Sequence, residues 1–196
     1  MGFQAPEVAE LNARVGEGGY LKFNRIHFSR GAGFYTLFPK VRLASMFTFS
    51  TFSGTRNEGN ASNWLRGTSA GTTLGVSVLN NGKLQLIPYG GVVYSWFGMR
   101  VASSVPGNTP FTGYLSGPSN QHHVSANQFM ANFGLHLAKT PLGNSAIGQQ
   151  LILGFRGGYY LPLGATAWKT NDAPLREGPA SSAGGLYVQL IVGLLQ

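Results

Sequence analysis

From Val41 to the C-terminus, apolar side chains recur at every second position in long stretches separated by turn-like segments. One stretch alternates polar or small residues with Phe129, Ala131, Phe133, Leu135 and Leu137. A period of two places such side chains on one face of a β-strand. The stretches are about twice as long as the 5–6 residues typical of globular strands, and they match the roughly 9–11 tilted residues that cross a bilayer in a β-barrel. The pattern therefore predicts an all-β membrane fold.

The composition suits a membrane wall better than a water-facing surface. Charged residues make up 10% of the 196 residues, hydrophobic residues make up 43%, and there are 29 glycines. Soluble globular proteins carry roughly 25% Asp, Glu, Lys and Arg. No run approaches the roughly 18 consecutive apolar residues of a membrane-spanning helix, so we expect any crossing to use strands. The absence of cysteine excludes disulfides and thiolate metal sites.

The net charge of +8 raises the question of a nucleic-acid partner. The basic residues are scattered and form neither a cluster nor a stripe interleaved with aromatic residues. The acidic residues all lie outside the strong strand patterns, at Glu7, Glu10, Glu17, Glu58, Asp172 and Glu177. Depletion of carboxylates from the strands explains the charge, and we predict no nucleic-acid partner.

We expect a lead-in segment at residues 1–17, with a short helical turn indicated by Val8, Leu11 and Val15, and then one domain at residues 18–196. The candidate strands are Gly19–Phe28, Gly33–Phe38, Val41–Ser53, Gly67–Leu79, Lys83–Val101, Ser125–Ala138, Gly148–Leu161 and Gly184–Leu195. Short connectors such as residues 80–82 alternate with longer ones near 54–66, 102–124 and 162–183. This alternation predicts an eight-stranded antiparallel up-and-down barrel, with short turns at one rim and long loops at the other.

The two faces of the candidate strands differ in chemistry. Phe47 and Phe49, for example, oppose Thr48 and Ser50. A soluble barrel would put its apolar residues inside and charged residues outside, but the polar face here carries too few charges to meet water. We therefore predict lipid outside and a narrow polar lumen, as in a transmembrane β-barrel. Residues 1–6 do not read as an export leader, so a bacterial outer-membrane location implies a leader already removed.

These patterns resemble a known family of membrane proteins. The alternation, the last strand Gly184–Leu195, and the segment Gly157–Gly164 followed by Trp168 look like small outer-membrane β-barrels of the OmpA/OmpX-like kind, notably those of Bacteroidetes. The likeness spans about residues 18–196 and is one of pattern. Such barrels usually end in an aromatic residue, whereas this chain ends in Gln196. The resemblance implies a single barrel in the outer membrane of a Gram-negative bacterium.

His123 and Ser125 are weak catalytic candidates, at the junction of the longest connector with a strand. A histidine two residues before a serine resembles the lipid A 3-O-deacylases, also eight-stranded barrels, in which histidine is the base and serine the nucleophile. That family needs an acid to orient the histidine, whereas the next acid here is Asp172, and Ala126 replaces the family's asparagine. We therefore favour a non-enzymatic role. The neighbouring residues His122 and His123 could bind a transition metal. Adjacent residues of a strand point to opposite faces, however, and no third ligand is apparent, so we predict no metal site.

Six residues are predicted to form a polar network in the lumen: Arg42, Arg100, Arg156, Tyr160, Tyr187 and Gln189. Inward arginines have no strand carboxylate to pair with, and a buried unpaired guanidinium costs several kcal/mol. Water, backbone carbonyls, the tyrosines or a bound anion are the available partners. A structural network is the favoured interpretation. A narrow anion-preferring pore is the alternative, although eight-stranded barrels are usually filled by side chains.

The expected function is structural or interactive, with long loops facing outward and the wall contacting lipid or other outer-membrane proteins. Four basic residues in the predicted loops are candidates to contact lipopolysaccharide phosphates, namely Arg56, Arg66, Lys169 and Arg176. No cofactor is expected. A lipid A deacylase-like hydrolase, a narrow anion pore and a soluble ligand-binding barrel are the alternatives.

Overall fold

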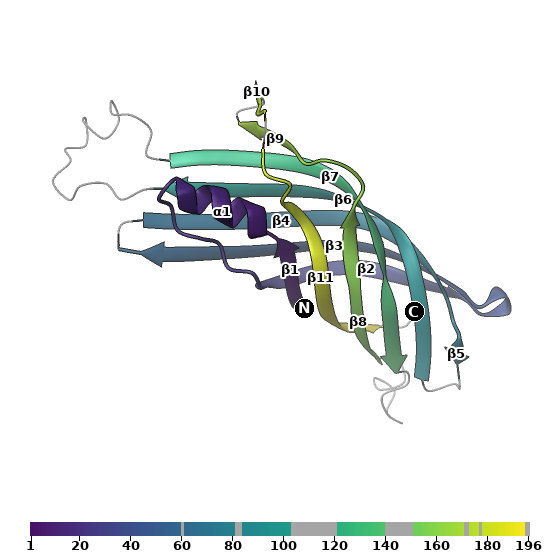
Figure 1. Ribbon diagram of the computed structural model, residues 1–196. Coiled ribbons are helices and arrows are strands. Elements are labelled where there is room, and N and C mark those ends of the chain that lie inside the picture. The colour runs from purple at the N-terminus through teal and green to yellow at the C-terminus, as the bar shows by residue number, and fades with distance from the viewer. Residues whose placement is uncertain are drawn as a thin grey trace.

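The computed structural model describes residues 1–59, 61–80, 84–102, 121–139, 151–170, 173–176 and 178–194. Its main feature is an antiparallel sheet in which eight strands pair side by side to form a ring (Figure 1). In order around the ring the strands are β1 (Gly2–Glu7), β2 (His27–Phe38), β3 (Leu43–Glu58), β4 (Ala61–Val76), β6 (Leu84–Ala102), β7 (Gln121–Lys139), β8 (Leu151–Pro162) and β11 (Ser182–Leu194). Because β11 also pairs with β1, the ring returns to its start. β1 pairs with β2 at only three positions, which is the shortest junction of the ring.

Shorter elements complete the described part of the fold. They are the helix α1 (Ala9–Glu17), a 3-10 turn at Pro39–Val41, and the strands β5 (Leu79–Asn80), β9 (Ala167–Thr170) and β10 (Ala173–Pro174). β5 pairs with the beginning of β6, whereas β9 lies between β10 and the beginning of β7. The described residues include no helix of the length and hydrophobicity that a membrane crossing requires.

The all-β antiparallel prediction is confirmed. The expected strands from Val41 onward correspond in order to β3, β4, β6, β7, β8 and β11, with ends that differ by up to six residues. Lys83, residues 148–150 and Leu195 of the expected strands lie outside the described ranges. The helical turn expected from Val8, Leu11 and Val15 is α1, in which Leu11 and Val15 are buried. Strong alternation thus located the strands that form most of the ring.

The prediction is wrong at the N-terminus. Residues 19–26 precede β2 and form no strand, and the expected strands Gly19–Phe28 and Gly33–Phe38 are replaced by the single strand β2. The eighth strand of the ring is β1, inside the segment expected to be a lead-in, where it pairs with β11 from Gly2 to Glu7. β1 is only six residues long and contains Pro6, so it is too short to show a clear alternation.

The connector expected at residues 54–66 is also wrong. β3 and β4 stay paired as far as Glu58 and Ala61, which leaves only residues 59 and 60 between the two strands. Polar residues such as Arg56, Asn57 and Asn63 fill both faces here, so the sequence loses the contrast on which the strand prediction depends. The expected connector 102–124 is partly strand, because β6 and β7 pair up to Ala102 and Gln121; residues 103–120 lie outside the described ranges.

The strands are strongly staggered around the ring. A path along paired residues leaves β7 at His136 and returns to β7 at Ala126, after passing Arg156, Gln189, Gly2, Ser29, Phe52, Gly67 and Phe97. The offset between His136 and Ala126 is ten residues. With a rise of about 3.3 Å per residue and a strand spacing of about 4.8 Å, this offset corresponds to a strand tilt of about 40°.

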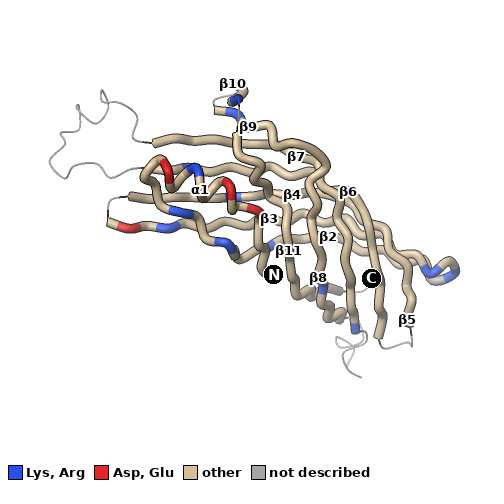
Figure 2. Tube along the Cα trace, in the orientation of Figure 1, with Lys and Arg blue, Asp and Glu red and all other residues tan. Residues whose placement is uncertain are grey.

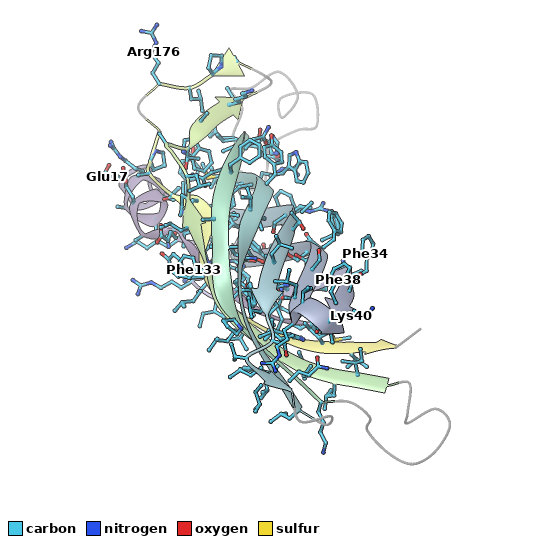
Figure 3. All side chains as sticks on the ribbon, turned by 90° about the vertical axis from the view of Figure 1, so that its right-hand side faces the viewer. Glu17, Phe34, Phe38, Lys40, Phe133 and Arg176 are labelled. Carbon is cyan, nitrogen blue, oxygen red and sulfur yellow. The ribbon has the colours of Figure 1, made fainter. Side chains whose placement is uncertain are left out.

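The inner face of the wall is mixed, with polar side chains and glycines next to buried apolar side chains, whereas the outer face is mostly apolar. Every strand of the ring contributes large exposed apolar side chains to the outer face, and we call this set the apolar belt: Phe3, Phe28, Phe34, Phe47, Phe49, Leu74, Val92, Trp96, Phe129, Phe133, Leu135, Leu153, Phe155, Leu186, Val188 and Leu190. Phe34 stands clear of the ribbon on its outer side (Figure 3). Lys, Arg, Asp and Glu are concentrated on α1, in the segments around it and near strand ends (Figure 2).

α1 lies at one rim of the ring, which we call the helix rim, where β3 ends at Glu58 and β6 ends at Ala102 (Figure 1). Val8, Leu11 and Val15 pack against inner-face side chains of the strands. The Leu11 amide donates to Ser181 Oγ over 2.8 Å. The Asn12 side chain accepts from the Phe23 amide at 2.6 Å and donates to its carbonyl at 3.0 Å. These bonds fix both the helix and the segment that follows it to the ring.

Candidate functional site

A cluster of polar side chains crosses the interior of the ring. Its members come from strands distant in the sequence: Thr73 (β4), Tyr89 (β6), Asn132 and His136 (β7), Arg156 and Tyr160 (β8), and Tyr187 (β11). Strand register explains their meeting, because Arg156 is opposite both His136 and Gln189, and Tyr160 is opposite Asn132. Paired residues on one face of a sheet point the same way.

Three tyrosines hold this cluster together. The hydroxyls of Tyr89 and Tyr187 are hydrogen-bonded to each other. Tyr187 uses its own proton to donate to Asn132 Oδ1 over 2.7 Å. The Tyr89 hydroxyl is therefore the donor to Tyr187, and it shares its proton with the Gly157 carbonyl 3.3 Å away. The rings of Tyr160 and Tyr187 stack with their centroids 4.3 Å apart. Buried hydroxyls are therefore satisfied across the interior from β6 to β11.

Arg156 is the one arginine of this cluster and is only 1% exposed. Its Cζ lies 4.2 Å from the centroid of the Tyr89 ring, and Nη2 donates to Thr73 Oγ1 over 3.3 Å. The described carboxylates belong to residues at the helix rim, so none of them neutralises this guanidinium. A cation over an aromatic face contributes about 0.5–2 kcal/mol, which offsets part of the cost of burial. Among the described residues, buried atoms without a hydrogen-bond partner include Arg156 Nε, Asn132 Nδ2 and His136 Nδ1.

Glycines let the wall close around this cluster. A Cβ added to Gly134 would lie 2.6 Å from the Tyr89 hydroxyl. A Cβ added to Gly158 would lie 2.8 Å from the hydroxyls of both Tyr89 and Tyr187. The interior at this height is therefore filled by side chains that fit directly against glycine backbone.

The interior toward the helix rim is filled differently, by aromatic and aliphatic groups. Phe52, Phe97 and Trp168 lie in one cluster with the buried face of α1. The rings of Phe97 and Trp168 meet edge to face with centroids 5.7 Å apart, and Trp168 Nε1 donates to the Pro179 carbonyl over 2.7 Å. The described interior therefore holds two groups of side chains, the polar cluster and this apolar group beside α1.

The structure places the predicted lumen residues in two groups. Arg156, Tyr160 and Tyr187 meet in the interior, and the partly buried Gln189 is opposite Arg156 on β11. The prediction is wrong for the other two. Arg42 is exposed in the turn after the 3-10 helix, with φ of 54°, and Arg100 is exposed on the outer face of β6.

Sequence reasoning missed Tyr89, Asn132 and Thr73 as members of the cluster. Tyr89 shares its face with Val93 and Phe97, so nothing in its strand marks it as polar-facing. Asn132 shares its face of β7 with Gln128 and His136, and this alternation of polar residues is the signal that would have identified it.

His123 and Ser125 lie together on the outer face of β7, near the helix rim. His123 is opposite Arg100, and Ser125 is opposite Gly98 on one side and Lys169 on the other. The described carboxylates that form contacts are engaged elsewhere: Glu7 with Tyr159, Glu10 with the Ala180 amide and Glu58 with Arg56. The candidate base therefore has no orienting carboxylate in the described chain, and Asp172 lies outside that part.

A shallow hollow of about 370 Å³ lies in the wall between β3, β4 and β6. Leu43, Leu74, Val76 and Pro88 line it, and a Cβ added to Gly90 would meet nothing within 4 Å. Its lining is apolar, so it suits a hydrocarbon chain or an apolar side chain. Across the described ranges, His, Asp and Glu side chains do not gather in threes as a metal site requires.

Comparison of the whole chain with protein-family models, curated proteins and solved structures finds no significant match.

Proposed function

We propose that this chain forms a transmembrane β-barrel of a bacterial outer membrane, with a structural or interaction role and no enzymatic one. Lipid surrounds the apolar belt, and the helix rim faces the aqueous side with its basic residues near lipopolysaccharide. The wall and the rim then contact lipids or other outer-membrane proteins. The proposal depends above all on one observation, the apolar belt on all eight strands of the ring.

Physical chemistry supports lipid as the surroundings of the belt. Soluble monomers rarely expose contiguous apolar patches above a few hundred Å². Here Phe34 is 71% exposed, Phe129 58% and Leu190 50%, on separate strands of the ring. The tilt of about 40° also falls in the range of roughly 35–45° found in membrane barrels.

Fluorescence quenching tests this proposal directly. Trp96 lies in the apolar belt, whereas Trp168 is buried in the interior. In vesicles of zwitterionic lipid with brominated chains, we expect strong quenching of Trp96 in a Trp64→Phe variant. A matched variant with Trp64→Phe and Trp96→Phe, which keeps only Trp168, should be quenched weakly. A protein that stays monodisperse without detergent and shows no quenching of Trp96 would contradict the membrane proposal.

The filled interior supports a structural role over a pore. A conducting path would run through the interior of the ring. Side chains stand in its way there, namely the stacked tyrosines, Arg156 and the aromatic residues near Trp168. We expect no discrete conductance steps in planar bilayers, and no change after Arg156→Gln. Reproducible anion-preferring steps that weaken in Arg156→Gln would favour the pore instead.

A second candidate, a hydrolase acting on lipid A esters, has one supporting observation. His123 and Ser125 share the outer face of the wall, where a membrane lipid would meet them. Incubation of the pure protein with lipid A, followed by mass spectrometry, tests this candidate. We expect no loss of acyl chains. Deacylation that disappears in Ser125→Ala but persists in a Thr68→Ala control would establish the hydrolase.

A further inference from the structure

Basic residues converge on the outer wall near the helix rim, where β4, β6, β7 and β9 run side by side (Figure 1). One row of paired residues across these strands is Arg66, Gly98, Ser125 and Lys169. The next outward-facing row toward the rim is Trp64, Arg100 and His123. We call the group formed by Arg66, Arg100, His123, Ser125 and Lys169 the basic wall site.

The sheet geometry brings these side chains within reach of one small group. Directly opposed residues have Cβ atoms about 4.5–5.5 Å apart, and diagonal neighbours are about 7–8 Å apart. Arg66 and Arg100 are diagonal neighbours across β4 and β6, and both flank Gly98. A Cβ added to Gly98 would meet only the Val124 carbonyl, at 3.7 Å, so the centre of the site is open.

Among the described residues, no acidic side chain compensates the positive charge of the site. Arg66, Arg100, Lys169 and His123 are exposed, and within the described chain no carboxylate forms an ion pair with them. The contrast is Arg56 at the same rim, whose Nη2 lies 3.5 Å from Glu58 Oε2. Guanidinium groups bind phosphate through paired charge-assisted hydrogen bonds, and a serine hydroxyl adds a further donor.

The surface below the basic wall site becomes apolar after one mixed row, in which Thr68 and Asn127 flank Trp96. Along β6 and β7 it continues into Trp96 and Phe129, which are 45% and 58% exposed, and Tyr94 packs against both rings. A ligand with an anionic head and a hydrocarbon tail would match a basic surface that is followed by an apolar one. A free phosphate would contact the basic surface only.

We propose that the basic wall site binds the phosphorylated headgroup of a membrane lipid, whose acyl chains lie over Trp96 and Phe129. The site rests on the proposed membrane function and specifies its lipid partner. It also gives Arg100, which faces outward, a role in lipid contact. Each basic side chain near an anionic lipid surface contributes about 1 kcal/mol, or roughly a fivefold preference.

Trp96 reports on the lipid next to the site. The experiment compares quenching of Trp96 by brominated phosphatidylglycerol and by brominated phosphatidylcholine, at equal mole fraction in otherwise unbrominated vesicles. All proteins carry Trp64→Phe. We expect the anionic lipid to be enriched at Trp96 by at least about fivefold. The variant Arg66→Gln, Arg100→Gln, Lys169→Gln should lower this enrichment to about one, because the headgroup loses its partners.

A matched control removes the same number of charges elsewhere at the helix rim, through Arg14→Gln, Lys22→Gln and Arg56→Gln. It should keep the preference for the anionic lipid. Equal quenching by the two lipids in the parent protein would overturn the site while leaving the membrane proposal intact. If the control also loses the preference for the anionic lipid, the preference comes from general electrostatics, and this outcome too would overturn the site. Absence of quenching by either lipid would instead contradict the membrane proposal itself.

Discussion

The two faces of the wall use the same residue types for different purposes. On β3, Phe52 points inward and is 2% exposed, while Phe49 points outward and is 46% exposed. The Phe52 ring lies so close to Gly67 that an added Cβ would come within 2.2 Å of it. On the outer face, by contrast, a Cβ added to Gly90 would meet nothing within 4 Å. The inner face therefore depends on close fit between side chains, whereas the outer face leaves large apolar side chains exposed.

The largest expected effect compares Phe52→Ala with Phe49→Ala. Phe52→Ala should lower the free energy of unfolding by about 3–5 kcal/mol, because the packed interior cannot refill the cavity. Phe49→Ala should cost much less, since mobile lipid or detergent chains occupy the vacated space. Denaturant titration in micelles, followed by circular dichroism, measures both. Equal losses would show that the two faces are packed alike.

A charge placed on the outer face tests what surrounds it. Leu190→Arg, in the apolar belt, should destabilise the protein in vesicles by about 2–4 kcal/mol. Leu163→Arg is the control, because Leu163 is similarly exposed at 56% but lies outside the strands. Unfolding titrations of vesicle-reconstituted protein compare the two. A water-facing wall would tolerate both arginines equally well.

Replacing one glycine on each face by alanine tests how tightly the inner and outer faces are packed. Gly158→Ala would press against the hydroxyls of Tyr89 and Tyr187, and overpacking of this kind costs about 1–3 kcal/mol. Gly90→Ala, which points into open space, should change stability by no more than about 0.5 kcal/mol. Thermal unfolding by near-ultraviolet circular dichroism separates these outcomes. A neutral Gly158→Ala would mean that the tyrosines have room to move.

The smallest effect concerns single hydroxyl groups. Tyr187→Phe leaves Asn132 Oδ1 without its donor in the interior and should cost about 1–2 kcal/mol. Tyr94→Phe lies on the outer face, where its ring contacts Trp96 and Phe129, and should be close to neutral. Urea titrations of both variants against the parent protein measure the difference. Similar losses in the free energy of unfolding for the two variants would show that the inner hydrogen bonds contribute no more than the outer hydroxyl does.

Sequence reasoning succeeded where the two faces of a strand have contrasting surroundings. The alternation through Phe129, Phe133 and Leu135 located β7, because every second residue is large and apolar. The strand prediction failed outside the apolar belt, around Arg56 and Asn63. Both faces of the paired strands carry polar residues there, so their sequence resembles that of a loop.

The candidate site residues follow the same division. Arg156 sits in a strand whose opposite face is strongly apolar, and its inward position was predictable. Arg100 is polar too, but near the helix rim the outer face is also polar, so polarity no longer reveals the side on which a residue lies. Register alone places Arg100 beside His123 on the outer wall.

Side-chain alternation is a local property of each strand, so the amino-acid sequence is enough to predict β-strands with one apolar face. The three-dimensional fold was needed to show that β1 completes the ring between β11 and β2, and that Tyr89, Arg156 and Tyr187 meet inside it. Those outcomes depend on which strands pair and with what stagger. Pairing is settled by contacts among residues far apart in the chain, and no local pattern encodes it.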